Sequence, residues 1–180
     1  YAKKINIPCF STPYDDEGVN LLKKLKCGIF KISSFEMNDL TLVEKICKIG
    51  KPVIISTGLA NLDEIKEVYK IAIKSGCKKL ILLYCVSSYP AKNEDFNLNN
   101  IEIFKKQFNC TVGFSDHSKD NSVAMIAVAK GARIIEKHLA LDNQKKGLDL
   151  EFSIKGKELL KFKKDVLKSW SLQGKTEFFR

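Results

Sequence analysis

Short apolar runs of strand length alternate with segments of helical periodicity along this chain, and that alternation limits its possible folds more than any other feature. The runs are continuous and rich in β-branched and aromatic residues, as expected for strands buried on both faces. They occupy 5–10, 27–32, 52–55, 80–84, 110–114 and 132–135. Such alternation predicts parallel strands joined by right-handed crossovers, which is an α/β fold.

Helix signals fill the segments between these runs. The apolar residues of 62–73 fall on one helical face, with Asn61 and Glu64 as a capping box before it and Gly76 as a stop after it. Similar signals predict a helix over 40–49 and another in the C-terminal region.

Composition narrows the class of protein. Of 180 residues 44% are hydrophobic, which suits one compact domain, and no apolar run approaches the roughly 18 residues that span a bilayer. The six cysteines lack CxxC spacing, so we expect free thiols, a cytoplasmic location and no zinc site made from cysteines.

The formal net charge of +10 raises the question of nucleic acid, an anionic surface or acidic substrates as partners. The lysines recur along every predicted helix opposite an apolar stripe, as a solvated surface does. We therefore expect no nucleic acid and no membrane as partners, and a non-catalytic basic binding module remains an alternative.

Polar side chains follow each apolar run on its C-terminal side. They lie at 11–12, 31–36, 56–57, 87–89, 115–117 and 136–138. In a parallel α/β fold these strand ends share the face that binds ligands, so the pattern predicts an active-site rim. Whether the sheet closes into a barrel or stays open is not decided by the pattern.

The chain has two histidines, His117 and His138, and each follows a predicted strand. If the strands are neighbours, about 4.8 Å apart, both imidazoles can face one divalent cation and leave coordination positions for water and substrate. The alternative is that each ring simply bonds a backbone carbonyl.

Lys31 lies inside an apolar run, where an ammonium needs a polar cavity and an anion. Hydroxyls on the rim would complete a cradle for phosphate or carboxylate. These are Thr12, Ser34, Ser56 and Ser115. A lysine that snorkels from a strand edge is the alternative. Glu36 is a candidate for proton transfer at the anion's carbon, or else a helix-entry residue that complements the dipole.

Other familiar sites have no support. The segment 113–117 lacks the second glycine of a nucleophile elbow, and no GxGxxG or GxxxxGK[ST] motif occurs. A serine hydrolase and a dinucleotide or P-loop site are therefore disfavoured.

A series of motifs in order resembles the sialic acid synthase family, which includes the N-acetylneuraminate, legionaminate and pseudaminate synthases. The motifs are Ser11-Thr-Pro13, Phe30-Lys-Ile-Ser-Ser-Phe-Glu36, Pro52-Val-Ile-Ile-Ser-Thr-Gly58, Cys85-Val-Ser-Ser-Tyr-Pro90, Gly113-Phe-Ser-Asp-His117 and Ile135-Glu-Lys-His138.

The resemblance implies a TIM-type (β/α) barrel that is incomplete, with about six of the eight βα units present. The expected partial barrel spans 1–170, and 171–180 is a linker or tail. The first two strands and the small C-terminal antifreeze-like domain of the family are then lacking. In the full-length family a homodimer is expected.

The resemblance also implies an activity, the condensation of phosphoenolpyruvate with an N-acetylated amino sugar of the N-acetylmannosamine type. The products are a nine-carbon sialic-acid-like sugar and phosphate, formed by metal-assisted C–C bond formation with C–O cleavage. Another phosphoenolpyruvate-dependent 3-deoxy sugar acid synthase or aldolase barrel is an alternative.

The family's functional positions carry over to residues of this chain. His117 and His138 would bind a divalent metal, most often Mn²⁺, and count with Glu36 as catalytic. Positions expected to hold phosphoenolpyruvate are Thr12, Lys31, Ser34, Ser56, Ser87 and Ser115. Tyr89 and Asp149 would contact the amino sugar. Ser87 replaces an asparagine found in some members.

Overall fold

The computed structural model describes residues 1–88, 91–175 and 177. The chain forms two compact units. The first unit contains Tyr1–Leu83 and Phe108–Thr111, and the second contains Tyr84–Gln107 and Val112–Arg180. Among the residues that the structure describes, no helix is long and apolar enough to cross a membrane.

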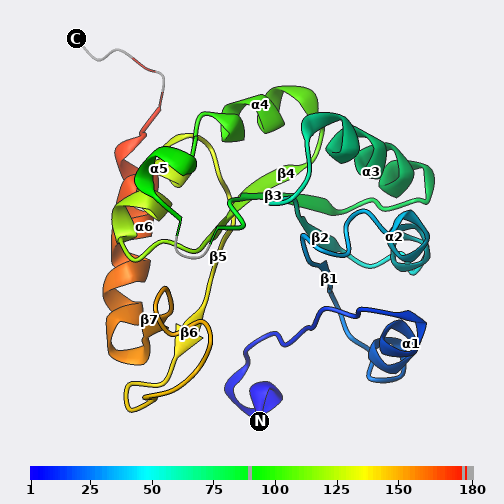
Figure 1. The fold of residues 1–180 in the computed structure, drawn as a ribbon, viewed down its shortest axis with the longest axis horizontal. Helices are drawn as coiled ribbons and strands as arrows, with labels where there is room; N and C mark the ends of the chain where they lie inside the picture. The colour runs from blue at the N-terminus through cyan, green and yellow to red at the C-terminus, as the bar shows by residue number, and fades with distance from the viewer. Residues whose placement is uncertain (89–90, 176, 178–180) are drawn as a thin grey trace. The chain divides into compact units, whose positions relative to one another are not determined.

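The first unit alternates strands and helices from one end to the other (Figure 1). Its elements are η1 (Ala2–Ile5), α1 (Asp16–Lys24), β1 (Phe30–Ile32), α2 (Leu40–Cys47), β2 (Val53–Ser56), α3 (Leu62–Lys74) and most of β3 (Leu80–Cys85). β1 pairs with β2, and β2 with β3, both in parallel. In this register Lys31 lies opposite Ile54, and α2 packs against α3.

The second unit continues the same pattern. Its elements are η2 (Asn93–Asp95), α4 (Asn100–Gln107), nearly all of β4 (Thr111–Asp116), α5 (Asn121–Ala129), β5 (Ile135–Lys137), β6 (Leu139–Ala140), β7 (Ile154–Lys155), η3 (Gly156–Glu158) and α6 (Leu159–Leu172). β4 and β5 are parallel, with Ser115 opposite Glu136 and Asp116 opposite Lys137. α5 and α6 lie side by side (Figure 1).

Burial follows the predicted logic of parallel strands. Every residue of β1 and β2 is buried, as expected when both faces of a strand are covered. In the second unit Phe114 is fully buried and the Tyr84 hydroxyl donates to the Phe96 carbonyl oxygen at 2.9 Å. These buried strands form the rigid base on which the polar strand ends sit.

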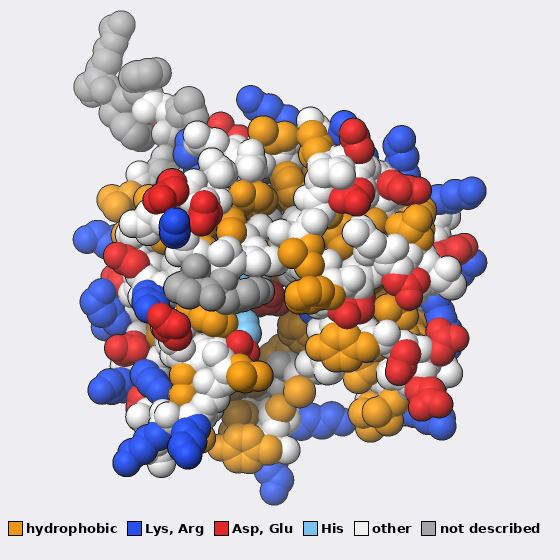
Figure 2. All heavy atoms as spheres, viewed as in Figure 1, with side chains coloured by type: hydrophobic (Ala, Val, Ile, Leu, Met, Phe, Trp, Pro, Cys, Tyr) orange, Lys and Arg blue, Asp and Glu red, His pale blue; other side chains and the backbone are white. Residues whose placement is uncertain are grey.

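Charged side chains of both signs are interspersed over the face seen in Figure 2. Several lysines form surface ion pairs, for example Lys66 with Asp63 at 2.8 Å and Lys130 with Glu102 at 3.0 Å. This distribution agrees with the interpretation of the positive charge as solvated surface.

The N-terminal run differs from the sequence prediction. Within the fully described range 1–88, residues 5–10 form no strand, and Ser11 makes only an isolated parallel bridge with Phe30. The side chains of Ile5, Ile7 and Phe10 are exposed. An apolar run becomes a buried strand only where neighbouring elements cover it, and here they do not.

β1 ends with its apolar run at Ile32, whereas the strands after it end later than their runs. β2 includes Ser56, β4 includes Ser115 and Asp116, and β5 includes Glu136 and Lys137. Backbone ladder bonds do not require apolar side chains, so the polar rim residues complete the strands instead of following them. The strands therefore hold these side chains more rigidly than loops would.

The predicted capping box of α3 is present. The Asn61 Oδ1 atom accepts from the backbone N–H groups of Asp63 at 2.9 Å and Glu64 at 3.1 Å, and the Glu64 carboxylate accepts from the Asn61 N–H at 2.8 Å. We expect Asn61→Ala to lower the free energy of unfolding by about 1 kcal/mol, because it removes these acceptors. Urea denaturation measures the change. Asn61→Asp keeps the acceptor, so an equal loss in that variant contradicts the explanation.

Candidate active site

The first unit buries a lysine ammonium at the C-terminal end of its strands. Lys31, in the middle of β1, is only 7% exposed. Its Nζ donates to Ser56 Oγ at 2.7 Å and to the Ile32 carbonyl oxygen at 3.3 Å. Because Lys31 is opposite Ile54 and side chains alternate along a strand, Ser56 lies on the same face as Lys31. The buried cation is therefore held beside a hydroxyl.

The loop after β1 brings further polar groups to this end of the sheet. Ser34 is buried, and its Oγ accepts from the Gly58 N–H at 3.0 Å, which ties the loops after β1 and β2 together. The Ser33 hydroxyl donates to the Glu36 carboxylate. Glu36 thus bonds its own loop, as a local structural role would require, and is half-buried.

Thr12 reaches the same region through the backbone. The Lys31 N–H donates to the carbonyl oxygen of Ser11 at 3.3 Å, and Thr12 is the next residue. The structure thus joins the predicted Lys31 to Ser56 and places Ser34 on the loop that follows β1, while Thr12 is tied to β1 only through the backbone of Ser11.

The second unit holds both histidines side by side. His117 directly follows β4 and His138 directly follows β5, and the centroids of their rings are 5.3 Å apart. His117 Nδ1 lies 3.2 Å from the Val86 carbonyl oxygen. A carbonyl only accepts, so this contact requires the proton on Nδ1, and Nε2 is then the nitrogen that would bind a metal.

The surroundings of His117 favour its neutral form. Burial lowers the pKa of His117, and the nearby His138 ring lowers it further, against the opposing effect of the bond to Val86. Neutral imidazole is the form that binds metals.

The loop 147–153 covers the two rings. Phe152 is buried and packs edge-on against both, with centroid distances of 5.7 Å to His117 and 5.0 Å to His138. Asp149 Oδ2 lies 3.5 Å from His138 Nδ1, at the outer limit of a hydrogen bond. One short loop thus supplies an apolar wall and a carboxylate to the histidine pair.

Two imidazoles are the protein ligands that this centre could offer a divalent cation. Throughout the described ranges, no group of three or more His, Cys, Asp or Glu side chains is arranged to hold a metal. With two imidazoles as ligands, a bound cation would keep positions for water and substrate, which is the pattern of an open, catalytic site.

Sequence reasoning missed Glu136. Its Oε1 accepts from the Ser115 hydroxyl at 2.7 Å, and the two residues are register partners on β4 and β5. Alternation along β5 puts Glu136 on the same face as His138. The sequence did contain a signal for Glu136, because this residue lies in the polar segment 136–138 of the predicted active-site rim.

Two predicted site residues, Ser87 and Tyr89, remain to be placed. Ser87 Oγ is buried, and among the described residues and their side chains it finds no hydrogen-bond partner. A buried hydroxyl without a partner costs about 1–3 kcal/mol, which a ligand could recover. Tyr89 lies outside the described residues. The second unit contains the other described site residues, which are Ser87, Ser115, His117, His138 and Asp149.

The comparisons with known proteins agree with the predicted resemblance. The profile of the NeuB family matches residues 1–178. The chain belongs to the NeuB family.

Two curated relatives with synthase names illustrate the similarity. An N,N'-diacetyllegionaminic acid synthase of Campylobacter jejuni is 43% identical over 88% of this chain and 48% of its own length. A pseudaminic acid synthase of the same species is 42% identical over 85% of the chain and 45% of its own length. The chain thus spans about half the length of these curated NeuB relatives.

A solved structure supports the fold class. The N-acetylneuraminic acid (sialic acid) synthetase of Leptospira borgpetersenii, in complex with citrate, matches 99% of this NeuB chain and 62% of its own chain, with 37% identity and a TM-score of 0.94. The chain has the fold of part of a TIM-type (β/α) barrel, so the predicted fold class is confirmed, with five parallel strands described in the sheet where six were predicted.

Proposed function

We propose that this NeuB chain takes part in condensing phosphoenolpyruvate with an N-acetylated amino sugar of the N-acetylmannosamine type. The methylene carbon of phosphoenolpyruvate bonds to the aldehyde carbon, water adds to the resulting cation, and phosphate leaves by C–O cleavage. The single observation that carries the proposal is the buried Lys31 ammonium, 2.7 Å from Ser56 Oγ.

A buried ammonium beside hydroxyls suits a phosphate or carboxylate. Lys31 would provide the charge, and Ser56 and Ser34 would donate hydrogen bonds to the oxygens of phosphoenolpyruvate. Ser87 would contact the substrate, because its buried hydroxyl would gain a partner from a bound ligand. Thr12 is proposed as a further hydroxyl donor to phosphoenolpyruvate, and Ser115, whose hydroxyl donates to Glu136, as a residue that contacts it.

The donor set of the second unit fits a divalent cation such as Mn²⁺. His117 and His138 would hold it through neutral imidazole nitrogens, with oxygen ligands completing the set. A bound cation of this kind polarises the carbonyl oxygen of an aldehyde. His117 is oriented for this role by its bond to Val86, and Phe152 keeps water away from one side of both rings.

Carboxylate side chains would serve as the acid or base that transfers protons during the reaction. Glu36 is proposed as the acid or base on the evidence of its motif, and Glu136 is a second candidate because Ser115 holds its carboxylate beside the histidines. Asp149 would orient the amino sugar from its place next to His138.

Calorimetric titration of phosphoenolpyruvate into the 180-residue chain, with and without Mn²⁺, tests the proposal. We expect saturable one-to-one binding in both conditions and tighter binding with Mn²⁺. Pyruvate is the matched control, because it keeps the carboxylate and lacks the phosphate, and should bind much more weakly. Equal binding of the two ligands, or none of phosphoenolpyruvate, contradicts the proposal.

A further inference from the structure

A buried ion pair lies immediately behind the two histidines. Lys137 Nζ is 3.0 Å from Asp116 Oδ2, and their side chains are 9% and 0% exposed. The two residues are register partners on β5 and β4. Each stands one position before a histidine, so alternation points their side chains away from the face that carries His117 and His138.

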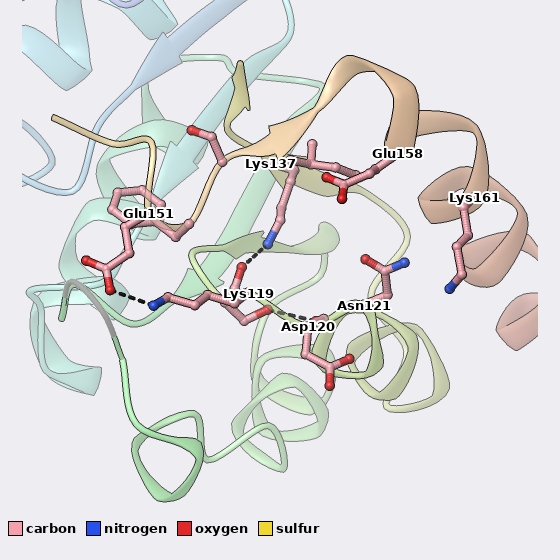
Figure 3. Close-up of a pocket in the computed structure, with 11 residues that line it drawn as sticks. Lys119, Asp120, Asn121, Lys137, Glu151, Glu158 and Lys161 are labelled. Atoms are coloured by element: carbon pink, nitrogen blue, oxygen red, sulfur yellow. Dashed lines mark hydrogen bonds and ion pairs between the residues drawn. The ribbon is translucent and has the colours of Figure 1, made fainter. Parts of the chain in front are cut away.

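The same two side chains also hold the residue that follows His117. Asp116 Oδ1 accepts from the Ser118 N–H at 2.8 Å, and Lys137 Nζ donates to the Ser118 carbonyl oxygen. Figure 3 shows Lys137 extending towards the loop that carries Lys119 and Asp120. The backbone is therefore fixed on both sides of His117.

Lys137 lines a pocket, but its ammonium is paired with Asp116 and is not a free binding group for a ligand. This cavity of about 630 Å³ contains three lysines, and each is already ion-paired within the protein. Lys119 pairs with Glu151 at 2.5 Å, and Lys161 with Asp165 at 2.8 Å. The charges here join parts of the protein to one another, which is a structural arrangement and not an anion site.

We infer that Asp116 and Lys137 form a positioning clamp for the histidine pair, an inference that rests on the proposed metal role of His117 and His138. The clamp joins the strand ends that present the two rings and fixes the peptide units around His117. A buried ion pair is seldom needed for stability alone, because apolar residues of similar size often replace it without loss. Groups that orient metal ligands typically change metal affinity 10- to 100-fold when removed.

The decisive variant is Asp116→Asn combined with Lys137→Met, which removes both charges and preserves side-chain volume. Because neither charge is left unpaired, we expect the double variant to fold. Its affinity for Mn²⁺, measured from the free Mn²⁺ signal in electron paramagnetic resonance, should fall at least about tenfold. Asp116→Asn alone leaves the buried Lys137 ammonium without its carboxylate and should lower stability, so the double variant is the one that tests metal affinity.

The matched control is Glu102→Gln with Lys130→Met, which removes a surface pair of equal length, 3.0 Å, in the same unit. It should leave Mn²⁺ affinity unchanged. Wild-type affinity in a folded Asp116/Lys137 double variant overturns the clamp and leaves the ion pair a purely structural role.

A second measurement needs no metal. The chain has two histidines, so ¹⁵N ring spectra show two rings, and the spectrum of His138→Ala identifies the one that belongs to His117. With the clamp intact, His117 should show the tautomer protonated on Nδ1, and the double variant should show averaged nitrogen shifts. If the wild-type chain binds no Mn²⁺, the metal role fails by itself, and an unchanged His117 spectrum in the double variant refutes the clamp separately.

Discussion

His117→Ala is expected to reduce the Mn²⁺ affinity of the chain more than about 100-fold, because losing a direct ligand should exceed the 10- to 100-fold effect of losing a group behind it. The bond to the Val86 carbonyl and the contact with Phe152 disappear with the ring. Titration calorimetry with Mn²⁺ measures the affinity.

The fold should survive this substitution. His117 lies directly after β4 instead of within it, and its hydrogen bond to Val86 contributes about 0.5–1.5 kcal/mol. His138→Ala should lose Mn²⁺ binding similarly. Metal uptake by a folded His117→Ala variant equal to that of the wild type contradicts the assignment of the pair as a metal centre.

Local signals in the sequence predicted α2, α3 and α6, whereas α1, α4 and α5 were not predicted. The cap of α3 at Asn61 depends on residues a few positions apart, so its chemistry can be read directly from the sequence. The predicted helix over 40–49 is α2, Leu40–Cys47, and Gly50 adopts a positive φ of 74° just after it. Such features need no knowledge of the tertiary structure.

Strand boundaries were harder because they depend on neighbours. The run at 5–10 was predicted as a strand, yet Ile7 is 57% exposed and belongs to no strand of the described first unit. Conversely, Glu136 and Lys137 belong to β5 although both are charged. Apolar character identifies the buried part of a strand, whereas pairing with an adjacent strand decides where the strand ends.

In the candidate site too, features that depend on one segment were predictable and features that depend on strand pairing were not. A lysine within an apolar run was enough to predict the Lys31 cluster, since a buried ammonium needs partners. The partnerships of Ser115 with Glu136 and of Asp116 with Lys137 could not be predicted, because each depends on the exact register of β4 against β5. Register shifts of one residue would reverse which side chains face the histidines.

Lys31→Met is expected to weaken phosphoenolpyruvate binding about 10- to 100-fold, because a hydrogen bond to a charged group contributes about 1.5–3 kcal/mol. Methionine fills similar space without the charge, so the packing of β1 against β2 is preserved. Calorimetric titration of phosphoenolpyruvate gives the change, and Mn²⁺ affinity, which concerns His117 and His138, should stay the same.

Stability distinguishes a binding role of Lys31 from a structural one. Lys31 is only 7% exposed, so burying its charged ammonium costs free energy of desolvation. Methionine removes that cost. Lys31→Met should therefore unfold at an equal or higher urea concentration than the wild type. A ligand-binding lysine therefore predicts opposite signs: stability kept or raised, and phosphoenolpyruvate affinity lost. If stability falls while phosphoenolpyruvate affinity is unchanged, Lys31 serves only to hold β1 and β2 together through Ser56, and the anion cradle is wrong.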